Sequence, residues 1–251
     1  MADERNFGSL DVSDFTVGAM LRSGIAIRRA VRGASTMEGA AGIVVRYFYD
    51  HCLSAETGTR ACALVRFYKT HRYGALEPAL KLAAAAKLGD GTPRDDVRCL
   101  ALLATVGDED GWNSRHRSRD HKVIPLPSAD VLRSAPMILR LVEELGIDVE
   151  SLVSAAAPVS RASDPRTYEV FHVEEALGSP VIPAQHDFVV QYGIASVVGF
   201  GGLLRSGEMF AVILFSRQRI PIASATRFRT IALDIRSALF PFDEEHTWGD
   251  A

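Results

Sequence analysis

Cysteine is scarce in this chain, and its few thiols follow no metal-binding or disulfide pattern. The sequence has 251 residues and 3 cysteines, Cys52, Cys62 and Cys99, none of which belongs to a C-x-x-C pair. A small secreted domain stapled by disulfides carries a denser and usually even set, whereas a sparse, odd set suits a reducing compartment. We therefore expect a cytoplasmic protein without a disulfide framework.

Two other absences exclude whole classes of partner. The chain has no apolar run of about 18 residues, the length that a membrane-spanning helix needs, and its polar start lacks the apolar segment of a signal peptide. Its formal net charge is -3, whereas a surface that binds nucleic acid needs a basic excess. We expect neither a membrane nor a nucleic acid as a partner.

The residues that are present describe an ordinary globular protein. Hydrophobic residues make up 47% and charged residues 24% of the chain, which is enough to bury one large core or two small ones. Apolar periodicity and turn residues place the elements of the first half. We expect helices over 14–32, 36–52 and 75–88, and strands over 60–69 and 99–106.

The first of these helices carries two apolar stripes. One contains Val17, Leu21 and Ile25, and the other contains Ile27 and Val31. A helix that is apolar on two sides has to bury both of them. We expect one stripe to pack on its own domain and the other on a second copy of the chain, in a homodimer.

The middle of the chain has the pattern of a helical insertion. Short helices are predicted over 128–133, 136–145 and 148–154, and a short strand over 168–173. Proline at a first helical turn and glycine just past a helix end support these boundaries. We expect this insertion to cover a pocket.

The last quarter of the chain predicts a hairpin backed by a helix. The runs 195–200 and 209–216 are rich in Val, Ile and Phe and are separated by a turn, so they predict two antiparallel strands. Both runs are almost continuously apolar, which is typical of strands covered on both faces, here by helices on one side and by a cavity or a lid on the other. Pro221 ends the extended segment, and Ser224 is the predicted N-cap of an amphipathic helix that ends near Phe240.

Several positions of this closing stretch recur in a known family. They are the strand entry Gly193-Ile194-Ala195-Ser196, the turn Gly207-Glu208, the strand end Leu214-Phe215-Ser216, Pro221 and the helix over 224–240. This pattern resembles the C-terminal half of GAF domains, which are small-molecule sensor domains. The resemblance implies an α+β fold of the GAF/PAS-like kind, with a central antiparallel sheet, helices packed on one face and a helical insertion over the other.

The resemblance also implies an organisation and a function. We expect residues 1–34 to form a tail and a helix for dimerisation or signalling, and residues 35–245 to form one GAF-like domain with an insertion at about 111–167. The implied function is a non-catalytic sensory or regulatory domain that binds a small-molecule ligand. We expect no output domain within this sequence after the last predicted helix. We expect the terminal helices to signal to another polypeptide, a histidine kinase or another output protein.

The segment 112–122 is the densest polar cluster of the sequence. It combines Trp112 with arginines, among them Arg115, and with histidines. Guanidinium groups pair with carboxylate or phosphate and an indole offers a stacking face, which suits an anionic small molecule. The alternative is a solvated loop whose arginines pair with the preceding acidic turn. The predicted ligand-binding residues are Phe67, Trp112, Arg115, His116, His121, Tyr168, His172 and Phe200.

Each polar residue of this set has an expected role. Arg115 neutralises the anion, Trp112 stacks on it, and His121 or His172 donates a hydrogen bond. The register of the strands is open at this point, and a slip of one residue would turn the other set of side chains inward.

The histidine and glycine patterns do not identify a cofactor. His116 and His121 fit neither H-E-x-x-H nor H-x-x-x-H, so no metal site is predicted. Haem needs only one or two axial ligands, which leaves haem or another chromophore open. The run Gly199-Phe200-Gly201-Gly202 precedes a hairpin rather than a helix. It therefore predicts backbone that bends or approaches a ligand closely, and no dinucleotide site.

An enzyme is the alternative to the sensor. Some GAF-fold proteins that this sequence resembles are methionine sulfoxide reductases, which use cysteines in loops around the pocket. Here Cys62 and Cys99 fall inside predicted strands and Cys52 at a helix end, where cysteine behaves as a small hydrophobe. A cysteine-based reductase remains the alternative function.

Overall fold

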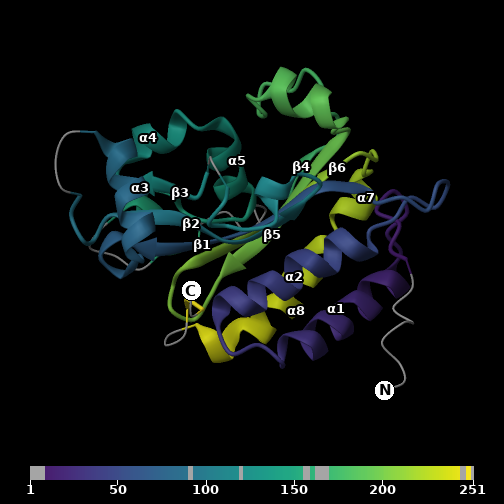
Figure 1. The fold of residues 1–251 in the computed structure, drawn as a ribbon, viewed down its shortest axis with the longest axis horizontal. Coiled ribbons are helices and arrows are strands. Elements are labelled where there is room, and N and C mark those ends of the chain that lie inside the picture. The colour runs from purple at the N-terminus through teal and green to yellow at the C-terminus, as the bar shows by residue number, and fades with distance from the viewer. Residues whose placement is uncertain are drawn as a thin grey trace.

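An antiparallel sheet of six strands runs through the middle of the molecule (Figure 1). The structure is a computed structural model and describes residues 9–89, 93–118, 121–154, 159–161, 170–243 and 247–249. The strand order is β3-β2-β1-β6-β5-β4. The strands are β1 (Cys62–Arg72), β2 (Arg98–Gly107), β3 (Val123–Leu126), β4 (Phe171–Val173), β5 (Ser196–Leu203) and β6 (Met209–Ser216). The predicted α+β class with a central antiparallel sheet is confirmed.

Helices cover one face of this sheet. Figure 1 shows α1 (Val17–Val31), α2 (Met37–His51) and α8 (Phe228–Leu239) side by side below it, and the short α7 (Ile222–Ala225) precedes α8. Three rings mark the centre of the core between these layers, because Phe200 of β5 lies 5.5 Å from Phe48 and 5.0 Å from Phe228. The helix α3 (Pro78–Leu88) packs on the β2–β3 end of the same face, beside the turn η1 (Tyr73–Ala75).

The insertion covers the opposite face, as predicted. It contributes η2 (Asp110–Trp112), α4 (Ala129–Arg133), α5 (Pro136–Glu144) and α6 (Val149–Val153), and the π-helical turn η4 (Gln185–Val190) adds to this layer. A second apolar core lies beneath them, in which Leu141, Leu152, Phe171 and Ile213 are buried. The apolar strands of the closing hairpin predict a cavity or a lid on this face. The lid is present, and apolar side chains fill most of the space under it.

The closing hairpin follows its prediction closely. Strand β6 has the predicted bounds Met209–Ser216 and pairs antiparallel with β5 along its whole length. The N–H of Leu204 donates to the carbonyl of Glu208 at 2.8 Å and closes the turn between the strands. Strand β1 then pairs with β6, which makes the two strands with the longest sequence separation neighbours at the centre of the sheet.

Ser224 is not the N-cap of the closing helix. It lies inside α7, which ends before α8 begins at Phe228, and the turn η5 (Phe240–Phe242) follows α8. The buried Ser224 hydroxyl instead accepts the N–H of Phe15 at 3.0 Å and donates to the carbonyl of Ser13 at 3.3 Å. The sequence around Ser224 has the pattern of a helix cap. The hydrogen-bond partners of the Ser224 hydroxyl, however, come from the N-terminal segment.

The strand β3 was not predicted. It contains Pro125 and pairs with the outer side of β2, so it forms an edge of the sheet. A proline cannot donate a ladder hydrogen bond and is tolerated in an edge strand for that reason. Among the helices described, none is long and apolar enough to cross a lipid bilayer.

A buried histidine makes the fold sensitive to acid. His71 of β1 is 6% exposed and lies 5.0 Å from the ring of Trp248. Burial, together with the nearby Lys69, lowers the pKa of His71 well below 6.5. The unfolded chain therefore binds a proton here in a pH range where the folded chain does not. The folded state is disfavoured progressively as the pH falls below 6.5.

We predict that His71→Gln reduces this loss of stability in acid. The free energy of unfolding of the unmodified protein should fall below pH 6.5 by up to about 1.4 kcal/mol per pH unit from this group, and that component should vanish in the variant. Urea unfolding at pH 7.5 and pH 5.5 measures the difference. His116→Gln, at an exposed position, is the control. An unchanged pH dependence in His71→Gln would contradict the assignment.

Candidate functional site

The central strand β1 presents polar side chains to the insertion. Alternation along the strand sends Phe67 into the helix-side core, where it stacks on Phe210 at 5.7 Å. The even-numbered residues point the other way. They are Arg66, Tyr68, Thr70 and Arg72. We refer to these four residues as the β1 stripe.

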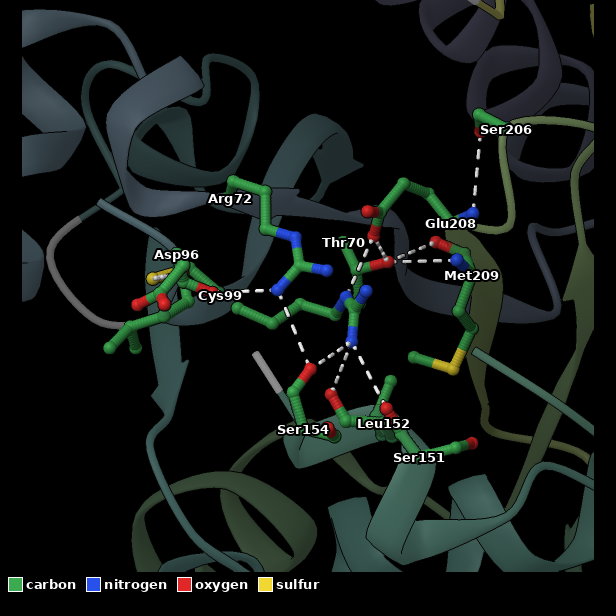
Figure 2. A network of polar contacts seen from close by, with 12 residues as sticks. Thr70, Arg72, Asp96, Cys99, Ser151, Leu152, Ser154, Ser206, Glu208 and Met209 are labelled. Atoms are coloured by element: carbon green, nitrogen blue, oxygen red, sulfur yellow. Dashed lines mark hydrogen bonds and ion pairs between the residues drawn. The ribbon is translucent and has the colours of Figure 1, made fainter. Parts of the chain in front are cut away.

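One end of the β1 stripe belongs to a buried network that holds the insertion (Figure 2). Arg98 of β2 is 2% exposed and directs Nη1 at three carbonyl groups at the end of α6. The distances are 3.2 Å to Ser151, 2.8 Å to Leu152 and 3.3 Å to Ser154. Its Nε donates to the carboxylate of Glu208 at 3.2 Å. A cation at the carbonyl end of a helix is stabilised by the helix dipole.

Thr70 and Arg72 complete this network. The Thr70 hydroxyl donates to Glu208 at 2.5 Å and accepts the N–H of Met209 at 2.8 Å. Arg72 Nη1 donates to the carbonyl of Asp96 at 2.7 Å. Burial lowers the pKa of Arg98 and the charge of Glu208 opposes the shift. The charged groups are paired and hydrogen-bonded, so this end of the stripe is a structural lock.

The other end of the β1 stripe is different. Arg66 pairs with Thr105 of β2, so their side chains share the face under the insertion. Thr105 is 7% exposed. The buried Oγ1 of Thr105 and the buried Nε of Arg66 have no hydrogen-bond partner within the described structure. Buried polar atoms are nearly always hydrogen-bonded, so this adjacent pair is a candidate point of contact for a ligand.

Trp112 lies beside this pair. Its ring covers Gly107, where an added Cβ would come within 2.7 Å of the indole. Gly107 is the next residue after Thr105 on the same face of β2, a step of about 7 Å. The Asn113 side chain fixes the turn that carries the indole, because its amide donates to the Gly107 carbonyl at 2.9 Å. The ring of Tyr192 packs on the indole at 4.6 Å.

These groups form the candidate site, which we define as Arg66, Thr105 and Trp112 with the neighbouring Tyr68. Arg66 Nη1 donates to the Tyr68 hydroxyl at 3.3 Å. A guanidinium and a hydroxyl can donate to the acceptor atoms of a planar anion, and an indole can stack on its face. In the described part of the chain, no three His, Cys, Asp or Glu side chains gather as metal ligands would.

Arg115 has a different set of partners from those expected. It is 7% exposed and lies between two carboxylates. Nε and Nη2 donate to Glu38 at 2.6 and 2.9 Å, and Nη1 and Nη2 donate to Glu77 at 2.6 and 3.0 Å. Burial works against the charge of Arg115, but these carboxylates raise its pKa overall. This clamp joins the start of α2 to the start of α3, and it occupies the guanidinium with protein carboxylates.

The other predicted ligand-binding residues lie in separate places. Phe67 and Phe200 are buried in the helix-side core. His116 and His121 are exposed, and His172 of β4 lies at the opposite edge with Nε2 2.7 Å from the carbonyl of Ile220. Tyr168 lies outside the described residues. Of the eight, Trp112 belongs to the candidate site. The ligand roles of all eight stay predictions.

Arg66 and Thr105 were missed for different reasons. The alternation of polar and aromatic residues from Arg66 to Arg72 is visible in the sequence and signals a strand with one polar face. Thr105 ends a continuous apolar run and shows no such signal. Its pairing with Arg66 depends on the register, which shifts between Phe67 and Tyr68 at a bulge.

None of the three cysteines belongs to the candidate site. All three are free and buried. Burial, with Cys62 next to it, raises the pKa of Cys52 well above its ordinary value, and burial raises the pKa of Cys99 to about 12. Thiolate is the reactive form of cysteine, so these two thiols are poor nucleophiles.

Comparison with solved structures finds GAF domains. The GAF domain of a phosphoenolpyruvate-protein phosphotransferase from Coxiella burnetii is 11% identical with a TM-score of 0.46, over 88% of this chain and 92% of that one. The GAF domain of the phosphotransferase from Acinetobacter is 10% identical with a TM-score of 0.42, over 89% and 94%. A phycoerythrobilin-bound GAF domain from a cyanobacterial phytochrome is 12% identical with a TM-score of 0.41, over 88% and 94%.

These structures belong to the class of domain that the sequence resembles. No protein-family model and no curated protein matches the chain. A likeness of this degree concerns the arrangement of helices and strands and says nothing about ligand or activity.

We predict that Arg98→Met strongly destabilises the fold. The variant leaves the buried Glu208 carboxylate and the α6 carbonyls without their donor, and removing one partner of a buried ion pair costs about 3–5 kcal/mol. Urea unfolding measures the loss, and hydrogen exchange of the α6 amides locates it. Arg133→Met removes an exposed guanidinium paired with Asp130 and is the matched control. Equal stability of the two variants would contradict the role of Arg98 as a lock.

Proposed function

We propose that this chain is a non-catalytic sensory domain of the GAF type that binds a small, planar, anionic molecule at the candidate site. The observation that carries the proposal is the pair of buried polar atoms without partners, Arg66 Nε and Thr105 Oγ1. A carboxylate or a comparable acceptor satisfies both at once, and Trp112 stacks on the attached ring.

The signal is proposed to leave through the terminal helices. Helices α1 and α8 pack closely, because an added Cβ at Gly24 would lie 1.9 Å from the carboxylate of Asp234. Arg28 of α1 and Asp234 of α8 also form an ion pair at 3.2 Å. A shift of α8 is therefore transmitted to α1. A ligand drives such a shift only through different affinities for the two arrangements.

The partner for this signal is proposed to be a second copy of the chain and, through it, a histidine kinase or another output protein. Val17, Leu21 and Ile25 are 54%, 54% and 56% exposed and lie on one side of α1. Ile27 and Val31, from the other stripe, are buried. A continuous exposed apolar stripe favours association, and a symmetric dimer brings two identical stripes together.

The reductase alternative has less support. It needs an accessible thiolate, whereas Cys52 and Cys99 are buried and have raised pKa values. The cofactor stays open. A visible absorption band in the purified protein would identify haem or another bound chromophore, and a featureless spectrum would leave colourless ligands.

The candidate site predicts binding of 8-anilinonaphthalene-1-sulfonate, a planar aromatic anion whose fluorescence rises in apolar surroundings. The chain has 2 tryptophans, so Trp248→Phe leaves Trp112 as the reporter. Its emission should be quenched by the bound dye. Arg66→Gln should raise the Kd about tenfold, the effect of losing about 1.4 kcal/mol in a charge-assisted contact.

Two further variants make this test sharper. Thr105→Val should stabilise the free protein, because it removes a buried hydroxyl without a partner, and yet weaken binding of the dye. Arg60→Gln removes an exposed guanidinium, 3.3 Å from Asp50, just before the same strand and should leave the Kd unchanged. Unquenched Trp112 emission, or an equal Kd for Arg66→Gln and Arg60→Gln, would remove the ligand from this site.

The α1 stripe predicts that Leu21→Glu separates the dimer. A carboxylate in the centre of an apolar interface loses its hydration, so the dissociation constant of the dimer should rise at least about tenfold. Analytical ultracentrifugation over a concentration series measures it. Leu82→Glu, at a 75% exposed position of α3, is the control. A protein that sediments as a monomer at every concentration would contradict the dimer.

A further inference from the structure

A short segment that follows α8 is fastened to the start of α2. We refer to residues 247–249 as the strap. The carbonyl of Thr247 accepts the N–H of Glu38 at 2.9 Å, and the N–H of Gly249 donates to the Glu38 carboxylate at 3.0 Å. The first N–H groups of a helix have no partner inside the helix. The strap supplies one of these missing partners to the first turn of α2.

Trp248 places its indole against two side chains. Its ring lies 5.0 Å from the imidazole of His71, and the guanidinium carbon of Arg115 lies 5.1 Å from the centre of the indole. A guanidinium is attracted to the face of an aromatic ring. Trp248 also packs on the apolar cluster that contains Tyr73 and Cys99. The strap therefore closes over the end of β1 that carries His71.

His71 is a buried polar group without a partner beside the strap. It is 6% exposed, and its Nε2 makes no hydrogen bond within the described structure. A neutral imidazole loses one hydrogen bond in this position, whereas an imidazolium would be a buried charge without an acceptor, which costs far more free energy. Burial, together with the nearby Lys69, accordingly lowers the pKa of His71 well below 6.5. The closed strap and a protonated His71 therefore disfavour each other.

The surroundings of His71 do not offset the charge of a protonated imidazole. Lys69, two residues earlier on the same face of β1, is 3% exposed and repels that charge. Cys99 lies opposite His71 on β2, and burial raises the pKa of this thiol to about 12, so it stays neutral. The carboxylates nearest the strap are already paired with Arg115. The described charged and titratable groups of this region are Glu38, Lys69, Tyr73, Glu77, Lys81, Cys99, Arg115, His116 and Asp243.

We propose that the strap is an acid-sensitive latch, which is closed over His71 while the imidazole is neutral and opens when the imidazole takes up a proton. Opening lets water reach the ring, so the open state takes up a proton near pH 6.5, the ordinary pKa of a histidine. The closed state takes up the proton only at a much lower pH. The ratio of open to closed strap therefore rises as the pH falls below 6.5, by up to about tenfold per pH unit.

The latch links acid to the helices that cover the sheet. Opening removes the acceptor of the Glu38 N–H and the donor to the Glu38 carboxylate, so it frees the first turn of α2. Helix α2 lies beside α1 and α8 on this face of the sheet (Figure 1). The contacts of the latch do not include Arg66, Thr105 or Trp112. Its test is therefore independent of the ligand proposed above.

Acrylamide quenching of Trp248 fluorescence tests the latch. The chain has 2 tryptophans, so Trp112→Phe leaves Trp248 as the single indole. Between pH 7.5 and pH 5 the quenching constant should rise toward that of an exposed indole, because the open fraction grows. Far-UV circular dichroism should stay constant over this range, which separates opening of the strap from unfolding of the chain. His71→Gln in the same background cannot take up the proton, so its quenching constant should stay constant. His186→Gln, at an exposed position, is the control and should keep the rise.

A reciprocal measurement removes the indole from the strap. Trp248→Ala lets water reach His71, so the pKa of His71 should rise toward 6.5. An NMR titration of the imidazole resonance, assigned with His71→Gln, measures it. Leu82→Ala, at a 75% exposed position of α3, should leave the pKa of His71 low. The latch is overturned by a quenching constant that does not rise in acid, by an equal rise in His71→Gln, by a rise that accompanies loss of circular dichroism, or by an unchanged pKa of His71 in Trp248→Ala.

Discussion

The buried guanidinium of Arg98 joins the two layers of this molecule. It lies between the sheet and the carbonyl end of α6, so the insertion cannot lift away without leaving a buried cation and several carbonyl groups unpaired. Glu208 supplies the opposite charge, and Thr70 orients Glu208 while it accepts the N–H of Met209. This contact and the apolar core beneath the insertion hold the lid over the sheet. The shape of the space beneath the lid then follows from its position.

The two ends of the β1 stripe differ in how their polar groups are paired. At Thr70 and Arg72 the polar groups are paired with protein atoms. At Arg66 and Thr105 the strand pair is the same, but a donor in each residue lacks a partner. The difference lies in what covers each end. Helix α6 supplies carbonyl groups at one end, whereas Trp112 covers the neighbouring Gly107 at the other with an apolar ring.

The buried arginines of this chain differ in whether a protein carboxylate lies next to the guanidinium group. Arg98 and Arg115 are almost fully buried and are neutralised by carboxylates, so their removal would disturb the fold. Arg236 instead lies 5.8 Å from the ring of Phe240, and its buried Nε has no hydrogen-bond partner within the described structure. Residue type alone does not separate these roles, because a guanidinium pairs equally well with a protein carboxylate and with a ligand. What separates the roles is whether a protein carboxylate lies within hydrogen-bonding distance of the guanidinium group.

Local features of the fold could be predicted from the sequence. The second helix, α2, and the strand Met209–Ser216 match the expectations, because an apolar period depends on residues within one or two turns of each other. The resemblance of the closing stretch to GAF domains also needed only local patterns. The prediction of Ser224 as a cap was wrong because its partner, Phe15, lies 209 positions away.

The amino-acid sequence by itself determined most of the helices and strands, the α+β class and the two-sided character of α1, but not the edge strand β3. The tertiary structure decided which polar groups meet. Arg115 was expected at a ligand, but Glu38 and Glu77 lie 77 and 38 positions away in the chain and were not visible as its partners. The pairing of Arg66 with Thr105 depends on the register of β1 and β2, which shifts at a bulge. Strand pairing between distant segments sets these contacts, and a shift of one residue would have sent each side chain to the other face.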